Sequence, residues 1–376
     1  MTRILGPHFP QSLLGLANRV LADFGLEPLY EPLSINWPPS DVVVLWIIDG
    51  LGWSDLNEAF HRQDMPFWHT QVHSPDRLNK LGSVFPTTTV TALSTFHFAR
   101  PPAHHGALGY TLWDPEILKT VNLLTSRDLM GTVCRSSIYD PRRTLYDELQ
   151  HRQIMSTVIS PGSHRGSALS AWWYHGASYF GYQSPSQIPG LVHRALAEQS
   201  RLIVVYWPGF DTISHIEGPA DLSGHLELQL LDWILAKTQA QIPQEASGRF
   251  VITSDHGSIA LAAPQHPTNP LLSRLYAGER RALYTAWSSG EVRRLCTEVG
   301  WDDAVIWPNE QLWDEGWFGG SPKDATFRLR MLQTTVLPPS NQQVIMPEPE
   351  PAIMAGGHGG WTEAERDIFV SWWPVH

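Results

Sequence analysis

Three aspartates of the 376-residue sequence stand where apolar runs end. Asp49 closes VVVLWIID, Asp211 closes LIVVYWPGFD and Asp255 closes FVITSD. Short continuous apolar runs of this kind predict strands that are buried on both faces, as in a parallel sheet. In open α/β sheets, ligands bind beyond the carboxyl ends of the strands. We therefore expect the three acids to converge on one crevice.

Histidines accompany these acids. His215 follows Asp211 by four residues, His256 comes directly after Asp255, and His358 lies in the stretch GGHGG. Carboxylates that share a crevice repel one another and raise their pKa values, and divalent cations remove that repulsion. Aspartates and histidines without sulfur suit zinc, with manganese or iron as alternatives. Six ligands are more than one tetrahedral zinc needs, so the sequence predicts two metal ions.

Each of these motifs is weak evidence when it stands alone. An aspartate after a strand is often a turn former or a helix N-cap. Asp-x-x-x-His arises often by chance, a turn would explain Asp-His-Gly, and GGHGG could be a flexible loop tip. Their combination favours a metal site, because every member falls at a strand end or in a glycine-rich loop.

A run of threonines adds a candidate nucleophile. The stretch VFPTTTVTALSTF, residues 84–96, places four threonines within five positions after a proline. β-Branched residues suit an edge strand, whereas the small residues that follow suit the start of a helix. A threonine hydroxyl is a weak nucleophile, but coordination to a metal favours its alkoxide form. One of these hydroxyls could therefore react if the metal ions lie beside it.

The elements that must position these residues alternate along the chain. A further buried strand is expected at 154–160 and a helix at 222–241. Such alternation predicts an α/β layered sandwich with a central, mostly parallel sheet flanked by helices. After residue 258, proline and short strand-like pieces dominate, so residues 259–350 are expected to form a small inserted cap. The catalytic core would comprise residues 1–258 and 351–376, with a last strand at FVSWW.

Composition and charge exclude several classes of protein. Hydrophobic residues make up 42% and charged residues 17%, as in a globular protein with a sizeable core. The net charge of −11 argues against binding to long nucleic acid or to an anionic membrane. Cys134 and Cys296 suggest neither a disulfide framework nor a thiolate zinc cluster. Without a convincing signal peptide or membrane span, we expect a soluble, cytoplasmic protein; its oligomeric state stays open.

The chain resembles a known superfamily in the order of five motifs, IIDGLG, PTTT, FDTISH, SDHG and GGHGG. The superfamily is that of the alkaline phosphatases, and the branch is the type I phosphodiesterase/nucleotide pyrophosphatase. The resemblance runs from about residue 41 to the C-terminus and includes PPAHHG and GWFGG. It implies an alkaline phosphatase-like fold. It also implies a two-zinc hydrolase of phosphodiesters or nucleotide pyrophosphates, with a small phosphate ester or nucleotide as substrate.

The resemblance further implies a role for each motif residue. One zinc would have four ligands, namely Asp49, Asp255, His256 and the hydroxyl of Thr89. The other zinc would have three protein ligands, namely Asp211, His215 and His358. Counting from Pro86 to Gly106 places the nucleophile at Thr89, whereas Thr87 and Thr88 would cap backbone N–H groups at the helix start. Thr89 would form a phosphothreonine that water hydrolyses, with overall retention at phosphorus.

Tyr110 departs from the pattern of the branch. In eukaryote-type members of the branch, an asparagine at this position contacts the phosphoryl oxygen. A phenol can donate one hydrogen bond, so Tyr110 could replace that contact. Alternatively, Tyr110 is a residue of the site's wall without such a contact. The preference for diesters therefore stays open. A phosphomonoesterase or a phosphonate monoester hydrolase on the same scaffold is the nearest alternative. A non-catalytic metal-binding module is the alternative from another class, and the complete ligand set together with Thr89 disfavours it.

Overall fold

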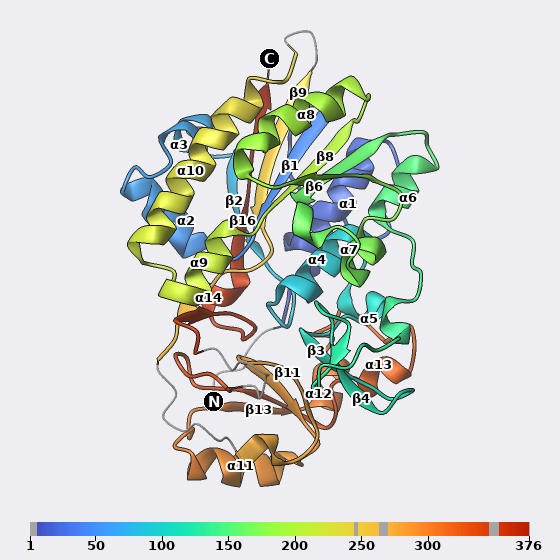
Figure 1. The fold of residues 1–376 in the computed structure, drawn as a ribbon, viewed down its shortest axis with the longest axis vertical. Coiled ribbons are helices and arrows are strands. Elements are labelled where there is room, and N and C mark those ends of the chain that lie inside the picture. Colours follow the sequence, from blue (N-terminus) through green and yellow to red (C-terminus); the bar gives the residue numbers. More distant parts are fainter. Residues whose placement is uncertain (1–5, 244–246, 263–269, 346–352, 376) are drawn as a thin grey trace.

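The main sheet of the computed structural model has seven strands (Figure 1). The structure describes residues 6–243, 247–262, 270–345 and 353–375. In spatial order the strands are β2 (Leu78–Gly82), β16 (Asp367–Val375), β9 (Gly248–Ser254), β1 (Val42–Ile48), β8 (Leu202–Trp207), β6 (Ser156–Pro161) and β7 (Ser178–Tyr182). Neighbouring strands are parallel, except that β16 runs antiparallel to β2 and β9. The predicted α/β fold with a mostly parallel sheet is confirmed.

Alternate residues of β1 pack on opposite faces of this sheet. Val43 and Leu45 belong to one buried cluster, and Val44 and Trp46 belong to another. The period of two follows from strand geometry, and burial on both faces explains the continuous apolar run. The first face is covered by α1 (Leu13–Asp23), α4 (Thr89–Phe98), α6 (Leu145–Gln150) and α7 (Ala168–Trp173). The second is covered by α2 (Trp53–His61), α3 (Pro66–Gln71), α8 (Ile188–Ala197) and α10 (Leu222–Gln239).

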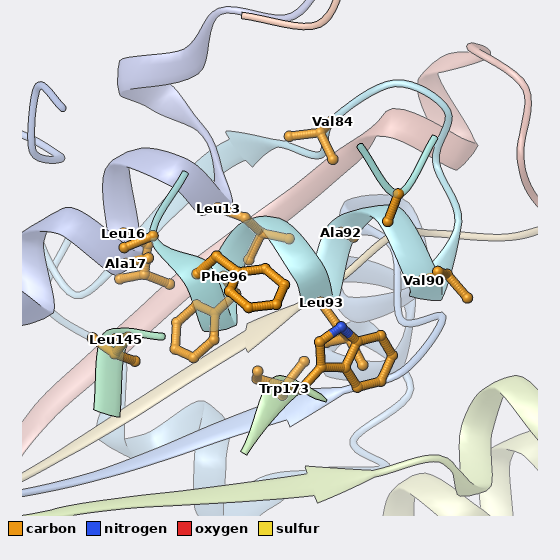
Figure 2. Packing of buried hydrophobic residues seen from close by; sticks show 14 of the residues in the cluster. Leu13, Leu16, Ala17, Val84, Val90, Ala92, Leu93, Phe96, Leu145 and Trp173 are labelled. Atoms are coloured by element: carbon orange, nitrogen blue, oxygen red, sulfur yellow. The ribbon is translucent and has the colours of Figure 1, made fainter. Parts of the chain in front are cut away.

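Helix α4 is held from several sides. Every residue from Val90 to Phe98 is buried, so this helix has no solvent-facing stripe beyond its first residue, Thr89. Figure 2 shows Phe96 of α4 beside Leu16 of α1, within the cluster that also includes the facing strands. Close packing of this kind allows little movement. The first turn of α4 is therefore a rigid support for its threonine.

The second sheet also has seven strands and draws them from two parts of the chain. Four come from the predicted cap: β11 (Tyr276–Glu279), β12 (Ala282–Thr285), β13 (Val305–Pro308) and β14 (Thr334–Leu337). Three come from earlier in the chain: β3 (Thr111–Asp114), β4 (Lys119–Asn122) and β5 (Arg127–Asp128). Helix α11 (Ser289–Glu298) packs on this sheet through Val292 and Cys296. Residues 263–269 and 346–350 of the predicted cap lie outside the described residues, and its boundaries stay a prediction.

Short elements complete the carboxyl edge of the main sheet. Helix α9 (Gly209–Glu217) begins just after β8, and α14 (Glu363–Arg366) precedes β16. A two-stranded ladder joins β10 (Ile259–Ala260) to β15 (Gly356–Gly357). Among the helices described, none has the length and apolarity needed to cross a bilayer. Cys134 and Cys296 are both buried free thiols.

Candidate active site

The structure brings the residues predicted from the sequence together at one edge of the main sheet, namely Asp49, Thr89, Asp211, His215, Asp255, His256 and His358. The strands that lead to the three aspartates are β1, β8 and β9, which are neighbours in the sheet. Because these strands are parallel, their carboxyl ends meet at the same edge. The expectation that the acids converge on one crevice is therefore met in the geometry.

Thr89 lies beside the first cluster of ligand-type side chains. Its Oγ1 is 3.1 Å from His256 Nε2 and 3.5 Å from Asp49 Oδ1. His256 Nε2 is in turn 3.4 Å from Asp49 Oδ1 and 3.4 Å from Asp255 Oδ2. Three possible ligand atoms, one each from Asp49, Asp255 and His256, lie within 4.8 Å of one another. This grouping is the one expected for the first metal ion.

The second cluster surrounds Asp211. Its Oδ2 is 3.1 Å from His215 Nε2, and its Oδ1 is 3.9 Å from His358 Nε2. His256 also belongs here, because ligand atoms of Asp211, His256 and His358 lie within 4.8 Å of one another. The rings of His256 and His358 stack, with centroids 3.7 Å apart. The two clusters thus adjoin through His256, and the division of ligands between two ions stays a prediction.

All three histidines are oriented through their Nδ1 atoms. The Nδ1···O distances to backbone carbonyls are 2.9 Å for His215 to Gly356, 3.1 Å for His256 to Gly257 and 2.9 Å for His358 to Thr87. A carbonyl can only accept, so each Nδ1 carries a proton. In the neutral ring the lone pair is then on Nε2, which faces the carboxylates. Metal-binding histidines are commonly fixed in this way.

Two carboxylate oxygens give the most direct sign that cations fit this site. Asp211 Oδ1 and Asp255 Oδ2 are buried and have no hydrogen-bond partner. By contrast, Asp255 Oδ1 accepts hydrogen bonds from the backbone N–H groups of Gly50, at 3.1 Å, and His256, at 2.9 Å. A buried carboxylate oxygen without a donor is costly unless a positive charge lies beside it. The donor set of oxygen and imidazole nitrogen suits a divalent ion such as zinc.

The electrostatics of the cluster follow from burial and from the closeness of like charges. Burial raises the pKa of Asp49 well above its usual value, and Asp255 and Asp211 raise it further. Burial likewise raises the pKa of Asp255 to about 7. Burial would also raise the pKa of Asp211, but His215 and His358 outweigh it and lower that pKa. Although burial opposes it, Asp211 raises the pKa of His215 to about 9. The metal-free cluster therefore holds protons that a cation would replace.

The neighbouring threonines tie the nucleophile turn to other parts of the site. Thr88 is the N-cap residue of α4, yet its side chain makes no capping hydrogen bond. The hydroxyl of Thr87 donates to the carbonyl of Gly360 and accepts from the N–H of Gly359, both at 3.0 Å. The expected helix-capping role of these two hydroxyls is therefore wrong. Backbone groups of the GGHGG loop bind the Thr87 hydroxyl in place of the helix.

A buried ion pair connects the second sheet to the same loop. Arg281, at the turn between β11 and β12, lies with its Nε 3.1 Å from Oε1 of Glu365. Glu365 Oε1 also accepts from the backbone N–H of Gly360, at 2.9 Å. Both charged side chains are almost wholly buried, so removing either one would leave an unpaired charge. The loop that carries His358 is thus fixed from both sheets.

A cavity of about 350 Å³ opens over the clusters and is large enough for a small substrate. Its wall includes residues that the sequence did not single out, namely Leu124, His164, Tyr206, Glu279, Arg280 and Met354. Tyr206 donates its hydroxyl proton to Asp49 Oδ2. Glu279 is buried with an unpartnered Oε1, and burial raises its pKa to about 8. The only sequence signal for Tyr206 was that a hydroxyl-bearing residue falls within a buried apolar run. The only signal for Glu279 was that it belongs to a charged hairpin in the predicted cap.

Tyr110 lies in the wall of this cavity. It stands just before β3, and its hydroxyl oxygen accepts a hydrogen bond from Asn122 Nδ2 at 2.6 Å. The phenol is thus held from the side of the second sheet. Its role toward a substrate stays a prediction.

The sequence matches one known protein family, and the fold matches several solved structures. Residues 43–272 match the model of one family, described as type I phosphodiesterase/nucleotide pyrophosphatase. No curated protein matches the sequence. Solved structures with the same fold include murine ectonucleotide pyrophosphatase/phosphodiesterase 5, which is 16% identical with a TM-score of 0.61, over 88% of this chain and 87% of that one.

Two further structures resemble the chain to a similar degree. Human ectonucleotide pyrophosphatase/phosphodiesterase 5 is 15% identical with a TM-score of 0.63, over 88% of this chain and 87% of that one. Phosphonoacetate hydrolase from Sinorhizobium meliloti 1021, in complex with phosphonoacetate, is 14% identical with a TM-score of 0.61, over 89% of this chain and 91% of that one. At such identities the likeness establishes the fold.

Proposed function

We propose a reaction for this chain, which belongs to the type I phosphodiesterase/nucleotide pyrophosphatase family of metal-dependent phosphate ester hydrolases. The reaction is hydrolysis of a small phosphodiester or nucleotide pyrophosphate, with Thr89 as the nucleophile. The observation that carries the proposal is the position of the Thr89 hydroxyl, 3.1 Å from His256 Nε2 and 3.5 Å from Asp49 Oδ1.

Two divalent ions complete the proposed site, with zinc preferred and manganese or iron as alternatives. The residues that would hold them are Asp49, Thr89, Asp211, His215, Asp255, His256 and His358. When bound, such ions supply positive charge that lowers the pKa of the Thr89 hydroxyl and stabilises the leaving oxygen. The unpartnered oxygens of Asp211 and Asp255 support this assignment.

The chain's own groups position the reacting atoms. Thr89 is the first residue of the ten-residue helix α4, so the N–H groups of the first turn are free to bind phosphoryl oxygens. In the first step a bond forms between Thr89 Oγ1 and phosphorus while the bond to the leaving oxygen breaks. In the second step water displaces the threonine oxygen and restores the hydroxyl. Two in-line displacements give overall retention at phosphorus.

The similar structures agree with this proposal. One is a murine ectonucleotide pyrophosphatase/phosphodiesterase 5 described as inactive when a threonine is replaced by alanine, in complex with AMP. Another is the phosphonoacetate hydrolase in complex with phosphonoacetate. Small phosphorus-containing anions are therefore the ligands with which to begin. Phosphomonoester and phosphonate hydrolysis are the alternatives on the same scaffold.

A small panel of esters tests the proposal. The protein is analysed for bound metals and then assayed with a nitrophenyl phosphate monoester, a phosphodiester and a phosphonate monoester. We expect two equivalents of a divalent metal and the fastest turnover with the diester. If the monoester or the phosphonate monoester is hydrolysed faster than the diester, the chain is instead a phosphomonoesterase or a phosphonate monoester hydrolase. Stoichiometric metal without turnover of any ester would favour a non-catalytic metal-binding module.

A further inference from the structure

The outer face of α10 carries a stripe of exposed apolar side chains. Among the described residues, fourteen large hydrophobic side chains are exposed, and five of these fall between residues 216 and 233. Four of the five lie on α10: Leu222 is 69% exposed, Leu226 54%, Leu230 41% and Trp233 53%. Spacings of four, four and three residues place them on one face of the helix.

The opposite face of α10 is apolar as well. Leu228, Leu231 and Leu235 are buried in the cluster that covers the main sheet. Figure 1 shows α10 as an outer helix of that layer, beside α8 and α3. Polar residues such as His225 and Glu227 lie between these two apolar faces, but contiguous exposed apolar surface commonly marks an interaction site. The exposed stripe therefore needs a partner.

Among the exposed residues of this face, charges lie only at its ends; the half-buried Glu227 turns inward to accept a hydrogen bond from Trp207 Nε1, at 2.8 Å. Between Asp221 and Lys237, which are both exposed, the exposed residues of α10 are Leu222, Leu226, Gln229, Leu230 and Trp233. The acidic end also includes exposed Glu217, the last residue of α9. The chain as a whole carries a net charge of −11, so an uncharged stripe of this length allows close approach of a second copy without repulsion at its centre.

We propose that this stripe is the contact surface of a homodimer in which the α10 helices of two copies lie antiparallel about a two-fold axis. If Leu226 faces the partner's Leu230, the same register sets Trp233 near the partner's Leu222. It also sets Lys237 beside the acidic end that holds the partner's Asp221. The surface thus places apolar side chains against apolar side chains and opposite charges at each end, as a self-complementary two-fold interface requires.

Other arrangements fit the charges less well. A parallel pair would place Lys237 beside the partner's Lys237 and bring the two acidic ends together. A lipid surface would favour a helix rich in Lys and Arg at its polar boundary, whereas this stripe has Lys237 alone at one end and acids at the other. The second copy is therefore the occupant that the charges favour. The proposal does not depend on the proposed reaction.

Sedimentation equilibrium of the full chain tests the proposal. We expect a dimer at micromolar protein, and a monomer with an unchanged circular dichroism spectrum for the double variant Leu226→Glu, Leu230→Glu. Met130→Glu is the matched control, because Met130 is 88% exposed and lies in the turn after β5, away from α10 in the sequence and in a different sheet layer. It should remain a dimer. A monomeric wild type, or a dimer that the double variant leaves intact, would overturn the proposal.

Two further measurements keep the result interpretable if the double variant folds poorly. Gln229→Cys should give a disulfide-linked dimer on mild oxidation, because residue 229 lies near the proposed axis, whereas Met130→Cys should not. Lys237→Glu should weaken the dimer several-fold at low salt, and adding Glu217→Lys should restore it. Absence of both effects would contradict the antiparallel pairing. Binding of monomeric wild type to phosphatidylcholine vesicles would instead assign the stripe to a membrane surface.

Discussion

The imidazole of His358 donates its Nδ1 proton to the backbone carbonyl of Thr87, across 2.9 Å. The side chain of the same threonine hydrogen-bonds to Gly359 and Gly360, the two residues that follow this histidine. Thr87 lies two residues before Thr89, although 271 positions separate it from His358. The turn that presents the proposed nucleophile and the loop that presents a proposed metal ligand therefore hold each other in place.

Replacing Thr87 by Val should weaken metal binding, because it removes the hydroxyl that anchors the loop of His358 but keeps the side-chain shape and the backbone carbonyl. We expect a loss of about tenfold in affinity, as for other groups that orient metal ligands. Titration against a competing chelator measures this. Thr91→Val is the matched control, since the Thr91 hydroxyl is buried without a hydrogen-bond partner. Equal affinity in the two variants would disprove the anchoring role.

Replacing Thr89 by Ala should lower kcat by about 10³-fold or more, because the proposed covalent step loses its attacking oxygen. Metal content should stay largely intact, since the aspartates and histidines remain. Mass spectrometry of the quenched wild-type reaction should find phosphate on Thr89 and none in the variant. Thr89→Ser, which keeps a hydroxyl, should retain part of the activity. Wild-type rates in Thr89→Ala would show that the nucleophile lies elsewhere.

Metal affinity should rise with pH, because the metal-free cluster holds protons at the ligand atoms. The pKa of His215 is about 9 and that of Asp255 about 7, and an ion must displace both protons to bind. Affinity is then expected to increase as the pH rises through 7 and toward 9. Calorimetric titration in two buffers of different ionisation enthalpy would detect the released protons.

The control for this pH dependence is His215→Ala, which removes the group with the higher pKa. This variant should bind metal more weakly overall, and its affinity should rise less steeply between pH 7 and 9 than that of the wild type, because the proton on His215 no longer has to be displaced. An affinity that stays constant from pH 6 to 9 in the wild type would contradict the proposed ligands.

Tyr110→Phe should lower kcat/KM by about 10²-fold if the phenol donates a hydrogen bond to the phosphoryl oxygen during reaction. Metal content should be unchanged, because Tyr110 is not a proposed ligand. Asn122→Ala should act in the same direction with a smaller effect, since Asn122 Nδ2 holds the phenol oxygen at 2.6 Å. Leu124→Ala is the control for a change in the cavity wall. Full activity of Tyr110→Phe would leave Tyr110 a wall residue.

The main sheet could be predicted because its strands are buried on both faces. The runs that end before Asp49 and Asp255 are β1 and β9, and the helix expected at residues 222–241 is Leu222–Gln239. The run that was expected to reach Asp211 is shorter than predicted: β8 ends at Trp207, and Asp211 lies in the first turn of α9. The second sheet could not be predicted. Its strands are two to four residues long, and the pairing of Gly278 in β11 with Thr111 in β3 joins distant segments without a local signature.

Three of the proposed ligands could be predicted from a strong local signal: Asp49 and Asp255 directly follow strands, and His358 lies in a glycine-rich loop. Asp211 and His215 instead lie one turn apart on α9, which begins just after β8. Tyr206 and Glu279 had no such signal. The apolar run LIVVYW predicts that its tyrosine is a core residue. Only the register of β8 beside β1 brings the hydroxyl of Tyr206 to Asp49. The burial of Glu279 depends on how the second sheet meets the GGHGG loop, which no stretch of the sequence records by itself.

The place of β16 in the main sheet bears on how the chain is made. This strand is synthesised after all its neighbours, yet it lies between β2 and β9 rather than at an edge. Until it emerges from the ribosome, β2 has no neighbouring strand, β9 has an open flank, and His358 is absent or newly made. Open flanks of this kind invite pairing with other chains. The nascent protein therefore passes through an aggregation-sensitive interval, which closes only when β16 inserts.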